Sequence, residues 1–237
     1  MLRRRGSARI QAFFRSLFVV VVCTATASGA TVSGRVQVSA SKDHAGVVIW
    51  LEPLAGDPPD TPPRTFSMAH QHKTFLPHVL AVRAGSKVQF PNLDPFFHNA
   101  FSNYDGEMFD VGLHAPGTVR GVTFHRPGIV RVFCNIHPTM SAVIVVLDTP
   151  WFAVSNAKGS FRIDDIPPGT YRLKVFSERA LPETLEKLER QITVGAGDLA
   201  LPDLAVSESS YVVTAHKNKF GNDYPAIIVD QYPGGRR

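Results

Sequence analysis

The chain has 237 residues, of which 44% are hydrophobic, and its 25 Lys and Arg against 20 Asp and Glu give a formal net charge of +5. Five of the arginines lie at or before position 15, and without them the basic and acidic residues are equal at 20 each. Because nucleic-acid binding requires clustered Lys and Arg to neutralise phosphates, the composition gives no support for a nucleic-acid partner. The hydrophobic fraction is typical of a globular chain with one large or two small domains.

Residues 1 to 30 have the pattern of a cleavable signal peptide. A basic segment without acids is followed by an apolar run at 17 to 22 and by small residues at 25 to 30 that suit a signal peptidase. The apolar run is too short to span a bilayer, since spanning takes roughly 20 apolar residues. We therefore expect a periplasmic or secreted protein without a membrane span in its mature chain. Lipid attachment at Cys23 is an alternative, although the preceding valine does not suit it.

Removal of the leader leaves Cys134 as the one cysteine of the mature chain. No intrachain disulfide can then form. An unpaired thiol is vulnerable in an oxidising compartment, so we expect Cys134 to be buried or bound to a metal.

Short strands separated by turns are predicted along most of the mature chain, because alternating or continuous apolar segments rich in β-branched residues indicate strands. These segments are 32 to 38, 47 to 51, 79 to 82, 87 to 90, 118 to 124, 129 to 133, 142 to 147, 161 to 163 and 171 to 175. Four prolines predict a loop at 56 to 64, and Glu, Leu and Lys favour a short helix at 182 to 190. The sequence therefore predicts an all-β fold of sandwiches or barrels.

A potential metal site surrounds the single cysteine. Cys134, His137 and Met140 follow one another at intervals of three residues between two predicted strands, a spacing that allows convergence in a loop but not in a strand. His98 would join them from a separate part of the fold. A thiolate, two imidazoles and a weak axial thioether form the trigonal set that favours copper in electron transfer. Zinc is the main rival, although Met is a poor zinc ligand, and Met140 could instead be a core side chain.

Residues 66 to 148 resemble the cupredoxin family of type 1 blue copper proteins, in particular the amicyanin and plastocyanin type. The resemblance rests on the segments 75 to 85, 88 to 94, 98 to 99 and 127 to 146. It implies a Greek-key β-sandwich that binds one type 1 copper ion. The implied equatorial ligands are His98, Cys134 and His137, and the implied axial ligand is Met140. Asn99, which follows the first histidine, is implied to tie the two ligand loops together and to support hydrogen bonding to the thiolate.

The same resemblance implies a one-electron carrier and not an enzyme. Its redox partner would be a c-type cytochrome or an amine dehydrogenase, because the similar carriers serve methylamine utilisation. Electrons would pass through an exposed edge of His137, beside Pro138, Thr139 and the pair Phe96 and Phe97. The sequence also shows no serine triad, no paired acids at a suitable spacing and no phosphate loop. A copper-delivery protein without a redox role, and a secreted binding module with a structural metal, are the alternative functions.

Residues 150 to 206 resemble the carboxypeptidase regulatory-like, or transthyretin-like, β-sandwich. The segments that carry this resemblance are 156 to 163 and 166 to 175. Such modules often begin with strands like those at 31 to 55, so we predict that these strands pair with 150 to 206 and that the cupredoxin domain of 66 to 148 is inserted between them. The alternative is a continuous cupredoxin domain that includes the first strands. Residues 207 to 237 are expected to form a loosely ordered tail, with a possible strand at 226 to 229.

The remaining histidines are not assigned to the copper site. His70 and His72 could form a second metal site, but no third ligand is evident, so we expect them in a solvated loop. His78 is expected to be structural or to lie near the copper loops. No partner is indicated for the others, which are His44, His114, His125 and His216.

Overall fold

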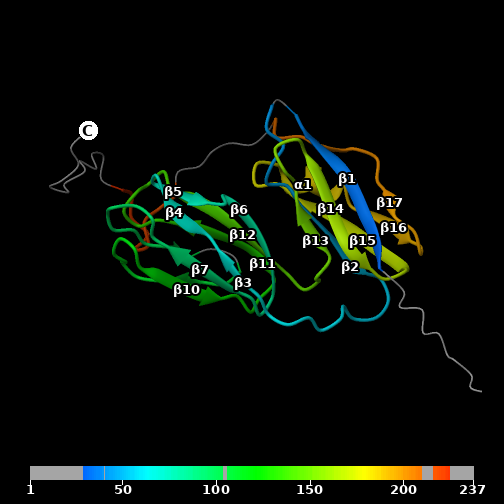
Figure 1. Ribbon diagram of the computed structural model, residues 1–237. Coiled ribbons are helices and arrows are strands. Elements are labelled where there is room, and N and C mark those ends of the chain that lie inside the picture. Colours follow the sequence, from blue (N-terminus) through cyan, green and yellow to red (C-terminus); the bar gives the residue numbers. More distant parts are fainter. Residues whose placement is uncertain (1–28, 40, 104–105, 210–215, 225–237) are drawn as a thin grey trace, which may run out of the picture.

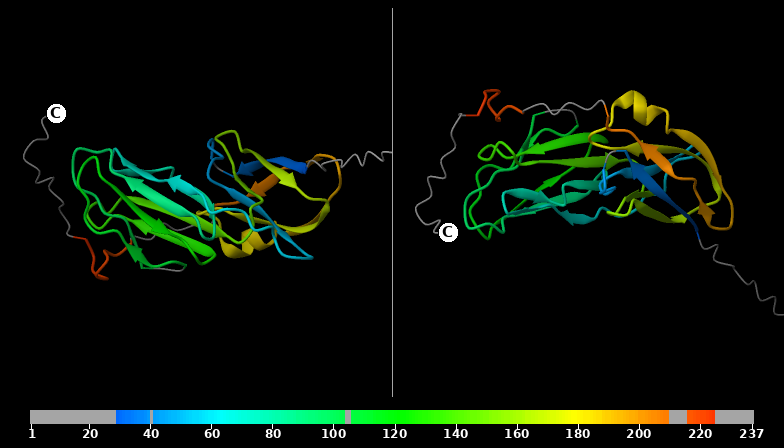
Figure 2. Two further views of the ribbon diagram at one scale, coloured as in Figure 1. Left: turned by 60° about the horizontal axis from the view of Figure 1, so that its bottom comes forward. Right: turned by 90° about the horizontal axis from the view of Figure 1, so that it is seen from above.

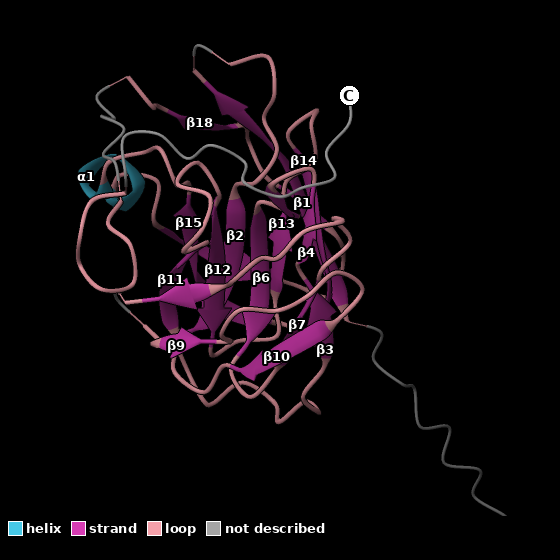
Figure 3. Cartoon of the chain, turned by 90° about the vertical axis from the view of Figure 1, so that its left-hand side faces the viewer, coloured by secondary structure: helices cyan, strands magenta, loops and turns pink. Residues whose placement is uncertain are grey.

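The computed structural model describes residues 29 to 39, 41 to 103, 106 to 209 and 216 to 224. Strands form almost all of the regular structure, which confirms the predicted all-β fold. Within the described residues the one helix is α1 (Pro182–Glu186), which is shorter than expected and stands among strands and loops in Figure 3. No helix in these ranges is long and apolar enough to cross a membrane. Residues 1 to 28 and the strand expected at 226 to 229 lie outside the described residues.

Two β-sandwiches lie side by side in Figure 1, and the two further views of Figure 2 show the same arrangement. Sandwich I comprises residues 65 to 147. One of its sheets has the strand order β10-β7-β3, the other has the order β6-β12-β11-β8-β9, and β4 and β5 form a separate hairpin. The strands are β3 (Thr65–Ser67), β4 (Ala69–Gln71), β5 (Thr74–Leu76), β6 (Val79–Arg83), β7 (Lys87–Pro91), β8 (Phe101–Ser102), β9 (Phe109–Asp110), β10 (Val119–Thr123), β11 (Gly128–Phe133) and β12 (Ser141–Leu147).

Sandwich II is built from chain segments on both sides of sandwich I. Its sheets have the orders β14-β1-β17, with β18 also paired to β1, and β13-β2-β15-β16. The strands are β1 (Ala30–Val38), β2 (Val48–Pro53), β13 (Phe152–Val154), β14 (Ser160–Ile166), β15 (Gly169–Phe176), β16 (Arg190–Val194), β17 (Leu199–Ala200) and β18 (Leu204–Val206). β1 pairs with β14, and β2 pairs with β15. Strands from near the two ends of the described chain therefore lie in one sandwich, where Figure 1 shows them in blue, yellow and orange.

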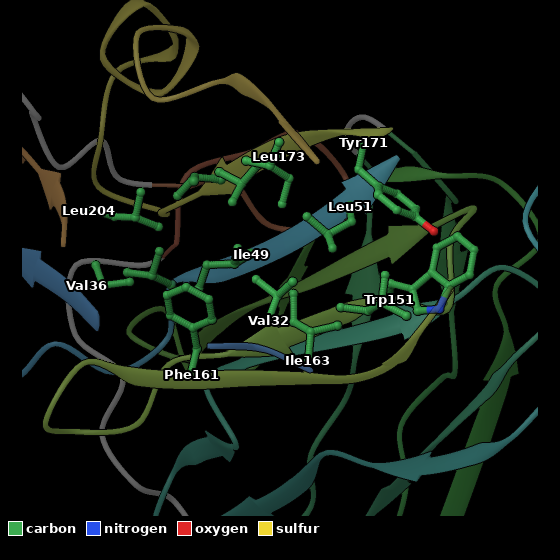
Figure 4. Close-up of a cluster of buried hydrophobic side chains, with 14 of the residues drawn as sticks. Val32, Val36, Ile49, Leu51, Trp151, Phe161, Ile163, Tyr171, Leu173 and Leu204 are labelled. Carbon is green, nitrogen blue, oxygen red and sulfur yellow. The ribbon is translucent and has the colours of Figure 1, made fainter. Parts of the chain in front are cut away.

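The core of sandwich II follows the alternation of its strands. Leu51 and Leu173 are opposite each other in the β2–β15 register, and both are fully buried. Figure 4 shows them facing the side chains of β1 and β14 across the interior. Trp151 closes one end with its ring edge against Tyr171, at 5.3 Å between centroids, and its indole N–H donates to the Asp165 carbonyl at 3.1 Å. Alternate apolar residues on both sheets thus meet in one interior, as a two-layer sandwich requires.

β12 is apolar along almost its whole length because both of its faces are covered. Ala142, Ile144 and Val146 belong to the core of sandwich I. Val143 and Val145 point the other way, into a third cluster that also contains Val48 of sandwich II, and we call this cluster the joint. Since successive strand side chains alternate between faces, one strand contributes to two interiors. Each fully buried Val contributes about 1.5–3 kcal/mol, so the joint resists separation of the sandwiches.

A polar contact crosses between the sandwiches at the edge of the joint. His78 precedes β6 and its Nε2 lies 2.5 Å from Oε2 of Glu178, which follows β15. The hydrogen bond to Glu178 raises the pKa of His78. Burial acts to raise the pKa of Glu178, but the His78 ring outweighs it and holds this pKa below its ordinary value. His78 therefore connects the two sandwiches. This agrees with the expectation that it is a structural residue.

We expect His78→Gln to lower the free energy of unfolding more at pH 6 than at pH 9. A raised histidine pKa stabilises the fold fully below the unfolded value of 6.5, and this contribution disappears as the pH rises through the folded pKa. The lowered pKa of Glu178 adds stability above pH 4.5, and this stability is lost as the pH falls below 4.5. The pair therefore stabilises the fold most between pH 4.5 and pH 6.5. Urea titrations at both pH values measure the effect, with exposed His125→Gln as the control. An equal loss at pH 6 and pH 9 would contradict the assignment.

Candidate metal centre

The turn of one hairpin carries Cys134, His137 and Met140. β11 and β12 are antiparallel, and Phe133 is opposite Ser141 at their ends, so residues 134 to 140 form the connection. The Cys134 amide donates to the Met140 carbonyl at 3.2 Å, and the Met140 amide donates to the His137 carbonyl at 3.0 Å. These bonds close the turn on itself. The closed turn places Cys134 and His137 on one short loop.

His98 enters from the segment between β7 and β8. Its backbone forms an isolated antiparallel bridge with His114, in which the His98 amide donates at 3.2 Å and the His114 amide donates at 2.9 Å. The bridge fixes the backbone of His98 beside the hairpin turn. His98 and the hairpin turn thus belong to different parts of the chain that the fold brings together.

Three predicted ligands converge in the interior of sandwich I. Nδ1 of His98 lies 3.9 Å from Sγ of Cys134, and Nδ1 of His137 lies 3.7 Å from the same sulfur. Their ligand atoms all lie within 4.8 Å of one another, and all three residues are buried. Bonds of about 2.3 Å to sulfur and 2.0 Å to nitrogen at trigonal angles span about 3.7 Å, so one ion fits between these atoms.

Met140 is buried at 1% exposure in the same core cluster as Cys134. Its place in the hairpin turn agrees with an axial position, and its burial agrees equally with a core role. Its part as a ligand therefore stays a prediction.

Asn99 connects the two segments that carry the ligands. Its Oδ1 accepts a hydrogen bond from the Asn135 amide at 3.3 Å, and its Nδ2 donates to Asp110 at 2.7 Å and to the Gly112 carbonyl at 3.0 Å. The side chain at 99 thus holds the residue after Cys134 against the segment that follows β9. The role that the family resemblance implied for Asn99, as support for the thiolate, stays a prediction.

The thiol of Cys134 lies in an apolar interior with a few polar neighbours. Burial raises the pKa of this thiol, and backbone N–H groups of Ile136, His137 and Asn99 act in the opposite direction by hydrogen bonding. A bound cation deprotonates a coordinating thiol outright. The backbone donors would then stabilise the thiolate that the metal creates.

Asp94, which the sequence did not single out, contacts the candidate ligand His98. His98 donates from Nε2 to Oδ2 of Asp94 at 2.8 Å, which leaves Nδ1 directed toward Cys134. The carboxylate also accepts the amides of His72 at 2.7 Å and Lys73 at 2.9 Å. Burial acts to raise the pKa of Asp94, but these hydrogen bonds outweigh it and keep the pKa below its usual value. Carboxylate support of this kind fixes the tautomer of a metal-binding imidazole and increases its basicity.

We expect Asp94→Asn to weaken Cu(II) binding by about 10–100-fold, the usual cost of losing the carboxylate behind a ligand histidine. The amide preserves the size of the side chain but removes its charge, so the imidazole becomes a poorer donor. Competition with a chelator measures the affinity, and exposed Asp148→Asn is the control. An unchanged affinity would show that Asp94 only shapes the loop.

His137 is more covered than the sequence suggested. Its exposed fraction is 5%, and the ring of Phe96 packs beside it at 5.6 Å between centroids. The exposed imidazole edge expected for electron passage is therefore small. Pro138 and Thr139, which follow His137 in the hairpin turn, are exposed, and Phe97 is 38% exposed on the segment that carries His98.

The two histidines of the His-Gln-His motif have different surroundings. His72 and Lys73 have positive φ angles of 54° and 56° and form the two-residue turn between β4 and β5. His72 is exposed, as expected. The expectation of a solvated loop is wrong for His70, which is fully buried because it lies on β4 against Phe75. Burial lowers its pKa to about 3, so the ring is neutral.

Residues 216 to 224 of the expected C-terminal tail pack against the hairpin turn. The Tyr224 hydroxyl donates to the Cys134 carbonyl at 2.8 Å, and the Lys219 amide donates to Oδ1 of Asn135 at 2.9 Å. Nζ of Lys219 lies 2.8 Å from Oδ2 of Asp110. This segment, red in Figure 1, therefore covers part of the ligand turn of sandwich I.

Within the described residues, the molecule is an all-β protein with a buried cluster of two imidazoles and one thiol suited to a soft metal ion. No protein-family model matches the chain, and no curated protein matches it.

Solved structures that resemble part of the chain include three copper proteins or cupredoxins. A Cu-containing nitrite reductase from Thermus scotoductus SA-01 is 28% identical over 40% of this chain and 25% of that chain, with a TM-score of 0.35. A Cu(I) amicyanin mutant is 17% identical over 35% of this chain and 82% of that chain, with a TM-score of 0.33. A purple cupredoxin from Nitrosopumilus maritimus is 19% identical over 35% of this chain and 99% of that chain, with a TM-score of 0.32. The chain thus spans a quarter of the nitrite reductase's length.

Proposed function

We propose that the protein is an exported type 1 copper protein that carries single electrons between redox partners. The observation that supports this most directly is the convergence of His98, Cys134 and His137 on one buried point. Two imidazoles and one thiolate in trigonal arrangement, with a weak thioether nearby, are the donor set that suits copper in electron transfer. Bound copper would supply a one-electron couple.

The residues of the chain would keep the coordination unchanged between oxidation states. Asp94 orients the ring of His98, and the closed hairpin turn holds Cys134 and His137. All three ligands are buried, so water has little access to the metal position. A site with four protein donors also leaves no position for a substrate, which favours a carrier over an enzyme.

The small exposed part of His137 offers the route between the metal and a partner. It lies next to exposed Pro138 and Thr139 on the hairpin turn, and exposed apolar side chains also occur at Leu93 and Phe97 on the segment that carries His98. Short-lived redox encounters bury little surface, under about 1,200 Å². A c-type cytochrome or an amine dehydrogenase fits such a weakly polar contact, and we propose this class of partner.

Spectra and electron-transfer kinetics test the proposal together. Protein loaded with one equivalent of Cu(II) should absorb strongly near ~600 nm through thiolate-to-metal charge transfer, whereas zinc-loaded protein should be colourless. Stopped-flow mixing with a reduced c-type cytochrome should bleach the band rapidly. A coloured protein that exchanges electrons slowly and loses copper readily to a chelator would instead support copper delivery.

We expect Met140→Leu to keep the absorption band and to raise the reduction potential. Loss of a weak axial donor disfavours Cu(II) relative to Cu(I), and the axial ligand is known to tune such potentials. Cyclic voltammetry measures the change. Met68→Leu is the matched control, because Met68 is buried in the same core cluster but lies outside the hairpin turn. The axial assignment is wrong if both variants have the potential of the unaltered protein.

A further inference from the structure

Two more histidines lie behind the candidate metal centre, in the interior of sandwich I. His70 is fully buried and His114 is 1% exposed. Their ring centroids are 4.7 Å apart, and the ring of His70 is also 4.9 Å from that of His98. His70 and His114 are far apart in the sequence, so the sequence alone does not show that they form a pair. The bridge between the backbones of His98 and His114 places the pair beside the first site.

Both rings lack the partners that buried imidazoles normally have. Nδ1 and Nε2 of His70 and of His114 make no hydrogen bond to the described residues. Burial lowers the pKa of His114, and the Gly112 backbone acts against this as a hydrogen-bond acceptor that raises it, but the geometry of this contact is too poor to satisfy a ring nitrogen. A buried polar group left unsatisfied costs about 1–3 kcal/mol, so such groups call for a bound water or ion. Each neutral ring has one bare nitrogen, so a single ligand that accepts an electron pair from each of them would satisfy both.

We propose that His70 and His114 bind a second metal ion, and that this ion is Cu(I). The ring centroids of His98 and His137 are 4.8 Å apart, nearly the same separation as for His70 and His114. The Nδ1 atoms of His98 and His137 both lie within 3.9 Å of one sulfur atom. Two rings at this distance can therefore direct nitrogen atoms at one point. Metal-binding histidines commonly point their other N–H toward a backbone carbonyl, the place that Gly112 takes beside His114.

The surroundings favour a monovalent ion of low coordination number. Phe75 and Phe90 lie against the ring of His70, so the enclosure is apolar on that side. In the part of the chain that the structure describes, a group of three or more His, Cys, Asp or Glu donors occurs only at the first site. Zinc requires four ligands, and a divalent charge costs more to bury than a single one. The nearby Asp94 carboxylate, whose charge acts on His70, partly balances one positive charge.

The experiment counts Cu(I) ions in the complete protein without oxygen. Competition with bicinchoninate should show two Cu(I) per chain in the unaltered protein, and one in His70→Phe and in His114→Phe. Phenylalanine keeps a ring of similar size in each position. The single-site variants should still develop the full ~600 nm band with one equivalent of Cu(II), because the first site is intact. His125→Phe, which changes an exposed histidine, should retain two ions.

X-ray absorption gives a second measurement that needs no variant. The mean number of sulfur neighbours per copper should fall by about half between one and two equivalents of Cu(I), because the second ion has only nitrogen donors. One Cu(I) per chain in the unaltered protein would overturn the proposal, as would an unchanged sulfur count or two ions in both phenylalanine variants. The second site does not depend on electron transfer. If copper-loaded protein showed no absorption near ~600 nm, the proposed function would be refuted. If the protein bound only one Cu(I) per chain, only the second site would be refuted.

Discussion

Replacing Cys134 with serine is expected to abolish the absorption near ~600 nm in copper-loaded protein, because the band arises from charge transfer from this thiolate. The hydroxyl of serine is a hard, weakly acidic donor that cannot replace the soft sulfur. The two imidazoles stay in place, so residual Cu(II) binding should give a weak spectrum without the thiolate band. Visible and electron-paramagnetic spectra of the two proteins measure the difference.

The control for this substitution is Thr139→Ser, which changes an exposed residue of the same hairpin turn. It should leave the band unchanged. Circular dichroism should show that Cys134→Ser is folded, since the serine is smaller than the cysteine it replaces. A band of undiminished strength in Cys134→Ser would mean that the sulfur is not a ligand, and the electron-carrier proposal would then fail.

The substitution Val145→Asp should lower the free energy of unfolding by about 3–5 kcal/mol, the penalty for an unpaired buried charge. Val145 is 1% exposed on the face of β12 that packs against sandwich II, and no cation belongs to that cluster. The carboxylate could reach water only if the two sandwiches moved apart. Urea denaturation, followed by both fluorescence and the copper band, measures the loss.

Val119→Asp is the matched control for the joint. Val119 is 53% exposed on β10, so the same chemical change there places the carboxylate in water. Its free energy of unfolding should change by no more than about 0.5 kcal/mol, as for most surface substitutions. Equal effects of the two variants would show that the joint contributes little to stability.

The strands could be predicted because their apolar patterns are local. The run at 142 to 147 was recognisable as a buried strand, and it lies within β12. What the pattern could not show is why both of its faces are apolar. That explanation requires the position of Val48, which is distant in the chain and lies on the other side of the joint. The predicted helix was longer than α1 because helix propensity alone does not define where a helix ends.

Cys134, His137 and Met140 could be singled out because they share one turn, whereas the distant His98 was assigned with the help of the family resemblance. Cys134 and His137 are three positions apart, so their spacing could be read directly. Asp94 gave only the weak signal of an acid four positions before His98, in a segment with no helical pattern to place both on one face. His70 was noticed only as part of the His-Gln-His motif, and nothing in the sequence paired it with His114. Their proximity depends on how β4 and the bridge at His98 are placed within sandwich I.

The double-sided burial of β12 makes this strand intolerant of changes in length. Because side chains alternate along a strand, inserting one residue between 141 and 147 would exchange the residues assigned to the two interiors beyond the insertion. The part of β12 beyond the insertion would then lose its register with β11 and with β6. Deletions and insertions should be tolerated better in the proline-rich segment at 56 to 64, where the backbone is irregular and none of the proposed metal ligands lies.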